Sequence, residues 1–306
     1  MASHPSLIKG IGCGIAAGVC WGAIFLGPAL TPGLSGTAFA VLRFLCYGLF
    51  SLVLLLPRWR RVWASLSQAD AISLFWLSLI GNLLYYALVG TGVQQTGVAT
   101  TSLIVGLIPV LVALAGRRDS NAVRLRLLMP SLCCAVAGVA LISVHALTQD
   151  NTAGSVWGVL CAFGALLGWS WYAVNNARRL AVTDVSAHDW SLLTGVITGA
   201  QSLLLAMLLP SSEWSGFSAP DWTRFLLVAA SVALLASVIG GVFWNHASRL
   251  LPLALSGQVL VIETLAALLL GFLWEQRWPT MIETAAVGLL VVGVVWCLRC
   301  HQRHPA

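Results

Sequence analysis

The stretch Phe225–Phe272 reads FLLVAASVALLASVIGGVFWNHASRLLPLALSGQVLVIETLAALLLGF. Two apolar runs flank a short polar link, Asn245–Leu250, and the second run carries one carboxylate, Glu263, with no other charged residue within ten positions. A charged side chain at the centre of a bilayer costs several kcal/mol, so it is usually paired or used. The stretch therefore predicts two consecutive membrane-spanning helices, the second with an acid that is either paired or functional.

A similar unit occurs earlier in the chain. From Ile72 to Gly116, two apolar runs meet at the link Gly92–Thr96, and Pro109 occupies the place of Glu263, 154 residues upstream of it. This similarity indicates that the chain contains two related halves.

The composition excludes a soluble domain. The 306 residues are 59% hydrophobic and only 8% charged, whereas soluble domains are about 25% charged. The net charge of +6 comes from short basic clusters between apolar runs. That arrangement is typical of membrane orientation, and we expect no nucleic-acid partner.

The eight cysteines do not predict a disulfide framework or a cofactor. Six lie inside apolar runs, where cysteine behaves as a small hydrophobic residue. The segment Cys297–His301 has the spacing of a c-type haem attachment site. It follows an apolar span and is expected in the cytosol, so we read it as a helix end. We expect no cofactor, no metal and no catalytic residue.

Ten apolar segments approach the twenty or so residues needed to cross a hydrocarbon core of about 30 Å. They are Ile8–Pro28, Gly36–Leu56, Ile72–Thr91, Gln95–Gly116, Leu127–Ala146, Ser155–Ala177, Trp190–Leu209, Thr223–Trp244, Leu251–Leu273 and Thr280–Leu298. Gly10, Gly14, Gly18 and Gly22 form a ridge suited to helix packing, so the first span is expected to be a retained helix and not a secretory signal.

The basic residues predict the orientation. With the N-terminus in the cytosol, thirteen of the sixteen Lys and Arg residues lie on the cytosolic side. The opposite side holds Arg224 and Arg277, and Arg43 lies within a span. The positive-inside rule then places both termini in the bacterial cytoplasm, after ten crossings.

Matching positions suggest an internal duplication. Gly10, Cys13 and Trp21 correspond to Gly158, Cys161 and Trp169 at a constant offset of 148. We expect two five-helix repeats, residues 7–147 and 154–300. Because five is odd, the second repeat enters the membrane the other way up. Inverted repeats place a substrate site near the bilayer midplane at their interface, so the expected fold is an all-α membrane protein with a central cavity.

The chain resembles the drug/metabolite transporter superfamily, in particular its ten-helix members built from EamA-type repeats. The resemblance rests on Gly14–Gly22, Arg43-Phe44-Leu45, Ile108-Pro109-Val110 and the segment Trp274–Trp278, and it covers nearly the whole chain. Glu263 departs from the proline that the family usually shows there. Within the superfamily the chain is most similar to the aromatic amino-acid exporters of the YddG type. The resemblance implies export of small amphipathic metabolites, aromatic amino acids above all.

Candidate substrate-binding residues are polar and aromatic side chains inside the spans. Tyr86 shares a helix face with Asn82, and Tyr172 shares one with Trp169. Such side chains can also pack helices or bond to their own backbone. The candidates are Trp21, Asn82, Tyr85, Tyr86, Thr100, Thr101, Trp169, Trp171, Tyr172, Asn175, Trp244, Asn245, Ser256 and Gln258.

Arg43 and Glu263 are the charged candidates, at compatible depths in their spans. Three interpretations stay open: a buried ion pair that fixes two helices, a proton-titrating carboxylate that drives exchange, and contacts to a zwitterionic substrate.

Other functions are less well supported by the sequence. Export of another metabolite or drug is the closest alternative. A membrane enzyme would need a catalytic set, but the His188-Asp189 pair is better explained by helix capping. A channel is a further alternative. The partners expected are a small-molecule substrate and the lipid bilayer; the oligomeric state is left open and is compatible with a monomer.

Overall fold

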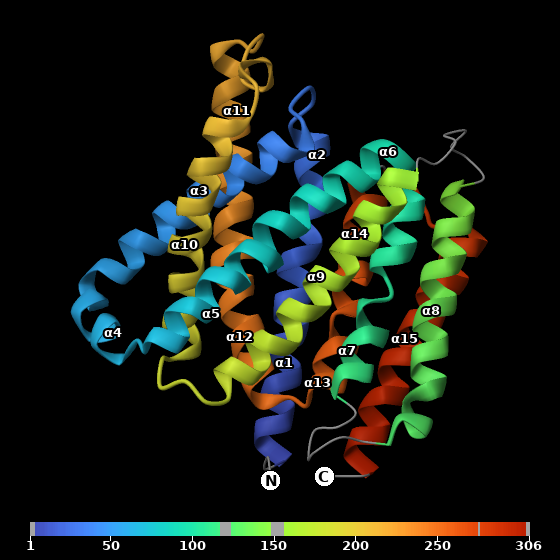
Figure 1. Ribbon diagram of the computed structural model, residues 1–306. Helices are drawn as coiled ribbons and strands as arrows, with labels where there is room; N and C mark the ends of the chain where they lie inside the picture. Colours follow the sequence, from blue (N-terminus) through green and yellow to red (C-terminus); the bar gives the residue numbers. More distant parts are fainter. Residues whose placement is uncertain (1–3, 117–123, 148–155, 275, 304–306) are drawn as a thin grey trace.

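The computed structural model of the chain describes residues 4–116, 124–147, 156–274 and 276–303, and every regular element in these ranges is a helix (Figure 1). The α-helices are α1 (His4–Gly22), α2 (Gly27–Leu30), α3 (Gly36–Leu55), α4 (Trp59–Ser65), α5 (Gln68–Ser78), α6 (Tyr85–Val105), α7 (Ile108–Gly116), α8 (Leu125–Leu147), α9 (Val156–Leu180), α10 (Ala187–Leu208), α11 (Ala219–Val232), α12 (Gly241–Leu250), α13 (Leu253–Val259), α14 (Val261–Trp274) and α15 (Met281–Arg303). Three short 3₁₀ turns are η1 (Ala23–Leu26), η2 (Leu56–Arg58) and η4 (Ser211–Glu213), and two π-helical segments are η3 (Leu79–Leu84) and η5 (Ala233–Gly240).

The helices combine into ten membrane-spanning rods. Seven helices of the described residues are long and apolar enough to cross a bilayer, and two shorter apolar helices, Ser6–Gly22 and Leu125–Leu141, add two more. The tenth rod consists of the second part of α6 together with α7. The all-α, ten-helix membrane fold is confirmed, and the two termini lie at the same end of the bundle (Figure 1).

The predicted link Gly92–Thr96 has helical backbone within α6. A straight helix would separate Gly92 from Thr101 by about 13.5 Å, at 1.5 Å per residue. Instead, a Cβ atom placed on Gly92 would lie 3.1 Å from the Oγ1 atom of Thr101. The chain therefore reverses direction between these two residues, as the prediction of two separate spans requires.

The second predicted link is wrong in position. Asn245–Leu250 forms the last turns of α12, and the chain turns at Leu251-Pro252 instead. The polar side chains did not end the helix because Asn245 is buried and hydrogen-bonded to another helix. Pro252 lacks a backbone N–H and immediately precedes the new helix α13, where proline is well tolerated.

The rods pair in a way that two inverted copies would generate. The second rod packs on the seventh (α3 on α10), the fifth on the tenth (α8 on α15) and the fourth on the ninth (α7 on α13). The first rod (α1) packs on the eighth (α12) and the ninth (α14). Correspondingly, the sixth rod (α9) packs on the third (η3) and the fourth (α7). The π-helical segments also correspond, because Leu79 and Ala233 begin them at the predicted offset of 154. The repeat boundaries 7–147 and 154–300 stay predictions.

Reciprocal glycine contacts follow the same symmetry. A Cβ atom on Gly48 would lie 2.7 Å from the Cα of Gly199, and one on Gly199 would lie 2.6 Å from the Cα of Gly48. In the fifth and tenth rods, a Cβ on Gly138 would lie 3.0 Å from the Ala286 oxygen, and one on Gly293 would lie 3.0 Å from the Ser131 oxygen. Small residues permit this close approach of the helix backbones. In lipid, where there is no hydrophobic driving force between helices, the resulting van der Waals packing drives helix association.

The glycine ridge of α1 packs against the ninth rod, as its spacing predicts. Cβ atoms placed on Gly10, Gly14, Gly18 and Gly22 would meet, in turn, Leu251, Val259, Ile262 with the backbone of Glu263, and Ala266. The ridge therefore positions Glu263 against the first helix.

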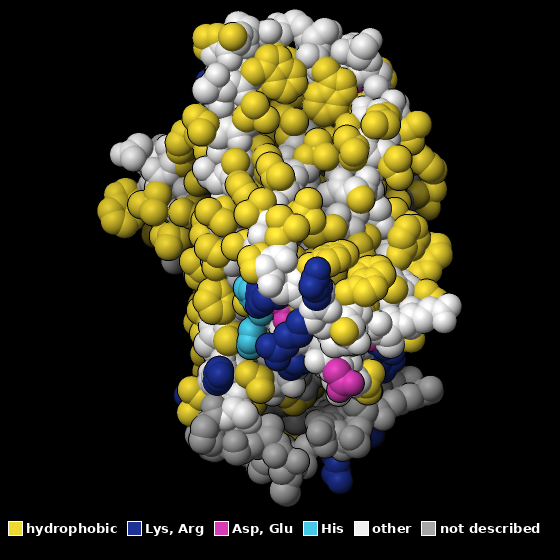
Figure 2. Space-filling model, turned by 90° about the vertical axis from the view of Figure 1, so that its left-hand side faces the viewer, with side chains coloured by type: hydrophobic (Ala, Val, Ile, Leu, Met, Phe, Trp, Pro, Cys, Tyr) yellow, Lys and Arg dark blue, Asp and Glu magenta, His cyan; other side chains and the backbone are white. Residues whose placement is uncertain are grey.

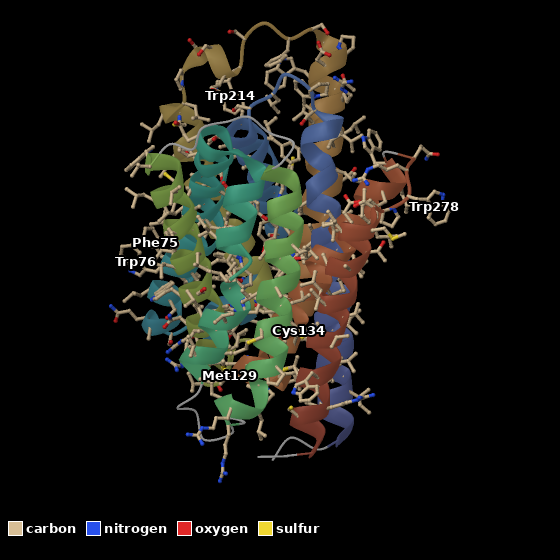
Figure 3. All side chains as sticks on the ribbon, turned by 90° about the vertical axis from the view of Figure 1, so that its right-hand side faces the viewer. Phe75, Trp76, Met129, Cys134, Trp214 and Trp278 are labelled. Carbon is tan, nitrogen blue, oxygen red and sulfur yellow. The ribbon has the colours of Figure 1, made fainter. Side chains whose placement is uncertain are left out.

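Large apolar side chains cover the outside of the bundle. Phe75, Trp76, Met129 and Trp278 point outward in Figure 3, and they are 45%, 48%, 47% and 92% exposed. Such a surface suits lipid as the surrounding solvent.

Replacing Gly22 by alanine should destabilise the protein. The new methyl group would lie 2.6 Å from the Ala266 Cβ and 2.9 Å from the Ala267 nitrogen, both too close. Overpacking of this kind costs about 1–3 kcal/mol. We expect a lower apparent melting temperature in detergent, measured by size-exclusion chromatography after heating.

Gly12→Ala is the matched control, because Gly12 lies in the same helix and a Cβ there meets nothing within 4 Å. It should melt like the parent protein. Equal melting temperatures for both variants would contradict the proposed packing of α1 on α14.

Candidate functional site

Three tryptophans from three helices meet at the centre of the bundle. The ring centroids of Trp21 in α1 and Trp169 in α9 lie 6.2 Å apart. Trp244 in α12 lies 5.4 Å from Trp21 and 5.7 Å from Trp169. Trp21 and Trp169 are the pair that the repeat offset made equivalent. The two halves therefore contribute matching residues to one interior cluster.

Tyrosines extend this cluster toward α3. Tyr172 lies 5.7 Å and Tyr85 lies 6.4 Å from Trp169. Tyr86 packs 5.1 Å from Tyr85 and 5.4 Å from Phe44. We call Trp21, Trp169, Trp244, Tyr172, Tyr85, Tyr86 and Phe44 the central aromatic cluster.

The π-helical segments help to place these rings. The indole N–H of Trp21 donates to the Ala236 carbonyl in η5 at 2.9 Å. In η3, Gly81 leaves room for Tyr172, because a Cβ atom there would lie 2.3 Å from the tyrosine ring. Tyr85 directly follows η3. π-helical turns occur frequently at functional sites, and here both border the same cluster.

Arg43 is buried beside the tyrosine end of the cluster, with 4% of its surface exposed. Its guanidinium carbon lies 4.5 Å from the centroid of Tyr86 and 4.7 Å from that of Phe44. Its Nε donates to the Ser237 hydroxyl of η5 at 3.3 Å. Aromatic faces and one hydroxyl thus compensate its charge in part, without a carboxylate.

Glu263 is half-buried in the first turn of α14. Among the described residues, its carboxylate has no hydrogen-bond or ion-pair partner. Arg43 is the charge that acts on it electrostatically, and Tyr85 lies within range of both groups.

Among the described residues, the structure shows no direct ion pair between Arg43 and Glu263. Arg43 and Glu263 are close enough to interact through space, yet they do not approach within the 4.0 Å of an ion pair. The three interpretations stay predictions, and this unbridged arrangement is the one that a titrating carboxylate or contacts to a zwitterionic substrate would require.

Several candidate amides join helices to one another. Asn82 donates to the Thr198 hydroxyl of α10 at 3.0 Å, and Gln258 accepts from the Ser131 hydroxyl of α8 at 3.0 Å. Asn245 accepts from the buried Asn176 at 2.9 Å. The first two bonds link the two halves, and the third joins two helices of the second half. Sequence alone cannot show these bonds, because each partner lies far away along the chain.

Other candidates lie away from the central aromatic cluster. Trp171 is 41% exposed on the outer face of α9, and Asn175 donates to its backbone oxygen at 2.8 Å. Ser256 donates to the Leu253 oxygen of its own helix at 2.9 Å, and Thr101 is buried beside Gly92. The side chain of Thr100 lies outside the described residues.

Two tryptophans show that position along a span does not determine exposure. Trp296, within the predicted span Thr280–Leu298, is 46% exposed, and Trp190, the first residue of the predicted span Trp190–Leu209, is fully buried. The indole N–H of Trp190 donates to the Asn176 amide oxygen at 2.9 Å. Position along a span indicates depth but not which face of the helix a side chain occupies.

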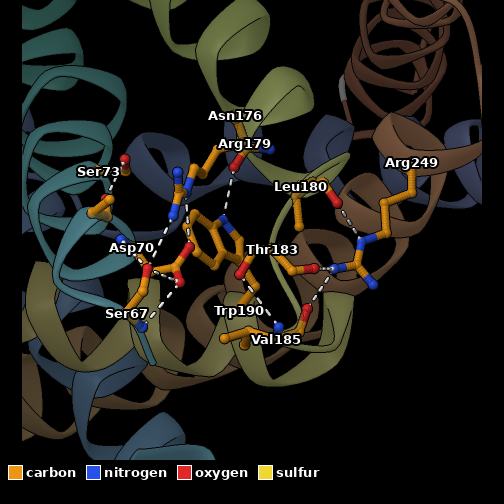
Figure 4. A network of polar contacts seen from close by, with 11 residues as sticks. Ser67, Asp70, Ser73, Asn176, Arg179, Leu180, Thr183, Val185, Trp190 and Arg249 are labelled. Carbon is orange, nitrogen blue, oxygen red and sulfur yellow. Dashed lines mark hydrogen bonds and ion pairs between the residues drawn. The ribbon is translucent and has the colours of Figure 1, made fainter. Parts of the chain in front are cut away.

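The end of the bundle that carries the termini is closed by polar contacts (Figure 4). Arg179 of α9 pairs with Asp70 of α5 at 2.7 Å, and Asp70 also accepts from Ser67. Arg249 of α12 donates to the backbone oxygens of Leu180 at 3.0 Å and Thr183 at 3.2 Å, and to that of Val185. The third, eighth and sixth rods are thereby tied together at this end.

Within the described part of the chain, no group of three His, Cys, Asp or Glu side chains could hold a metal ion. Two buried donors, the Trp244 indole N–H and the Gln258 amide nitrogen, have no hydrogen-bond partner there. Such groups are costly in isolation and are available to a polar ligand.

Comparisons with known proteins give a family, a relative over the full length and a shared fold. Residues 8–144 match the EamA-like transporter family. The inner membrane protein YtfF of Escherichia coli (strain K12) is 31% identical over 316 residues, which covers 98% of this chain and 98% of that protein. A protein of known crystal structure superposes with a TM-score of 0.73 at 20% identity, covering 96% of this chain and 98% of the other.

Replacing Asn176 by alanine should lower stability. It would leave the buried Trp190 N–H and the Asn245 oxygen without partners, and each such loss costs about 1–3 kcal/mol. We expect a lower apparent melting temperature in detergent. Asn175→Ala, one residue away and bonded only to its own helix, should leave it unchanged. A drop shared by both variants would show that the interhelix bonds are not responsible.

Proposed function

The chain belongs to the EamA-like transporter family of the drug/metabolite transporter superfamily, and we propose that it exports small amphipathic metabolites, aromatic amino acids above all, across a bacterial inner membrane by alternating access. Family membership supports the general role of membrane transporter. The substrate class and the mechanism are inferred from the interior of the bundle.

The observation that carries the proposal is the pair of opposite, unbridged charges beside the tyrosines. Arg43 can hold a carboxylate through its planar guanidinium, and Glu263 can hold an ammonium group. An amino acid presents both groups within a few bonds of each other. A zwitterion placed between Arg43 and Glu263 would neutralise both charges, which is strongly favoured where water is scarce.

The central aromatic cluster supports a flat apolar side chain on the substrate. Trp21, Trp169 and Trp244 present indole faces from three helices, and aromatic pairs of this kind add about 0.5–1.5 kcal/mol beyond burial. The unpartnered Trp244 N–H offers one donor within the same group. Asn82 is engaged with another helix, so we assign it to structure and not to substrate binding. Gln258 uses its oxygen to bind Ser131, and its unpartnered amide nitrogen offers a second donor to the substrate.

The symmetry of the helix pairs supports alternating access. Inverted repeats can exchange conformations, so that a site on their interface opens first to one side and then to the other. The contacts at the terminal end, among them Asp70–Arg179, join the two halves. They would have to break for the site to open at that end.

The charge distribution supports a cytoplasmic location for that end. Thirteen of the sixteen basic residues fall on the side of the termini in the proposed topology, which the positive-inside rule places in the cytosol. No constellation among the described residues argues for an enzyme, and the family points to transport.

Arg43→Gln and Glu263→Gln should each lower transport of tryptophan. We expect saturable exchange by wild-type protein in reconstituted vesicles, and roughly a tenfold or greater loss in each variant, because a charge-assisted contact to the substrate disappears. The measurement is counterflow of labelled tryptophan without a pH gradient, repeated as accumulation with one.

Asp184→Asn is the control, since Asp184 is an exposed carboxylate in the α9–α10 turn, and it should transport like the parent. If Glu263→Gln keeps full counterflow and loses only accumulation driven by the pH gradient, then Glu263 couples protons and does not bind substrate. The charged and titratable groups that act on it are Arg43 and Tyr85. Full activity in both variants would end the zwitterion proposal.

A further inference from the structure

Arg43 is an exception to the way basic residues are distributed on this molecule. On the face shown in Figure 2, Lys and Arg side chains gather toward the end that carries the termini, below a broad hydrophobic surface. Arg43 instead lies inside the bundle on α3, with 4% of its surface exposed. A guanidinium group has five N–H donors and keeps its charge inside proteins. Its orientation here is therefore determined by the few groups that contact it.

The two aromatic rings beside Arg43 fix its position more than its orientation. The guanidinium carbon lies 4.5 Å from the centroid of Tyr86 and 4.7 Å from that of Phe44. The attraction between a cation and an aromatic face depends mainly on the distance between the charge and the ring centre. A directional contact is needed to decide which N–H groups point toward a ligand.

Ser237 supplies this directional contact. Its hydroxyl accepts from the Nε of Arg43 at 3.3 Å, and only 8% of the residue is exposed. Within the described residues, this is the one hydrogen bond that Arg43 makes. With Nε engaged, the two terminal nitrogens are left to a ligand. They present two parallel N–H groups, the arrangement that binds a carboxylate through both of its oxygens.

The segment that carries Ser237 also fixes one ring of the central aromatic cluster. Ala236, the preceding residue of η5, accepts the indole N–H of Trp21 at 2.9 Å. Gly240 leaves room for that indole, because a Cβ atom there would lie 2.9 Å from its Nε1 atom. One π-helical segment of the second half therefore orients an aromatic ring and a charged group that both belong to the first half.

We propose that Ser237 is a positioning residue that makes the site selective for substrates with a free carboxylate. It holds the Nε of Arg43, so that the terminal nitrogens face the substrate carboxylate, and it does not itself touch the substrate. This inference rests on the proposed function, in which Arg43 binds that carboxylate. A compound that keeps the ring and the amine but lacks the carboxylate gains nothing from Ser237.

A purely structural role for Ser237 makes different predictions. Its hydrogen bond also joins α3 to η5, and loss of a helix contact would lower stability and weaken the binding of every substrate. A positioning role affects the binding of carboxylate-bearing substrates alone. The two roles are therefore separated by comparing tryptophan with its methyl ester.

The test is counterflow of labelled tryptophan by the full-length protein in reconstituted vesicles, with tryptophan methyl ester as a competitor. Ser237→Ala should raise the KM for tryptophan about tenfold, because the carboxylate no longer meets a fixed pair of N–H groups. Vmax, the inhibition constant of the methyl ester and the apparent melting temperature should stay at the wild-type level. Ser237→Thr keeps the hydroxyl and should restore the KM.

Ser170→Ala is the matched control. Ser170 is as buried as Ser237, at 7% exposed, and its hydroxyl has no hydrogen-bond partner among the described residues. This variant should transport tryptophan with the wild-type KM. If Ser170→Ala raised the KM as much as Ser237→Ala, the effect would belong to the loss of any buried hydroxyl, and the assignment would be wrong.

Three further results would overturn the positioning role while wild-type exchange remains normal. They are an unchanged KM in Ser237→Ala, an equal weakening of tryptophan and its methyl ester, and a folded Ser237→Thr variant that loses as much as Ser237→Ala. A different result marks failure of the proposed function: wild-type vesicles that do not exchange tryptophan, or that bind the methyl ester equally well. The positioning role would then fall with it.

Discussion

Arg43 and Glu263 carry opposite charges in the interior of an apolar bundle, and they do not form an ion pair. Burying a charge without a partner inside a membrane protein has a high free-energy cost. The cost for Arg43 is reduced by the faces of Tyr86 and Phe44 and by the Ser237 hydroxyl. Among the described residues, Glu263 has no comparable partner. The interior is thus built to retain an unsatisfied acid, and a ligand that carries a positive group would satisfy it.

Close helix packing keeps the two charges at this separation. Lipid supplies no hydrophobic force between helices, so association depends on contacts that small residues permit. The Gly48–Gly199 contact fixes α3, which carries Arg43, against α10, and Gly18 fixes α1 against the first turn of α14, which carries Glu263. The helix pairs of the two halves are related by symmetry. Trp21 and Trp169 therefore occupy equivalent positions in their halves, and their rings are in contact. Both halves therefore contribute aromatic side chains to one interior cluster.

The sequence predicted the architecture well because hydrophobic length, basic clusters and glycine spacing act locally. The predicted end of a helix was wrong where that end depended on a partner distant in the sequence. Asn245 looked like part of a polar link, but Asn176, 69 residues away, satisfies it inside the bundle. The same limit applies to the site: spacing placed Trp169 and Tyr172 on one face, whereas Ser237 beside Arg43 could not be found without the fold. Trp171 and Trp296 show that depth in a span does not decide between the interior and the lipid.

The most direct test of the central claim is whether recognition requires both charges of the substrate. In counterflow by wild-type vesicles, unlabelled tryptophan should compete fully with labelled tryptophan. Tryptophan methyl ester, which lacks the carboxylate for Arg43, and N-acetyltryptophan, which lacks the ammonium for Glu263, should each compete at least about tenfold more weakly. Equal competition by all three compounds would contradict the account, because the aromatic ring alone would then determine binding.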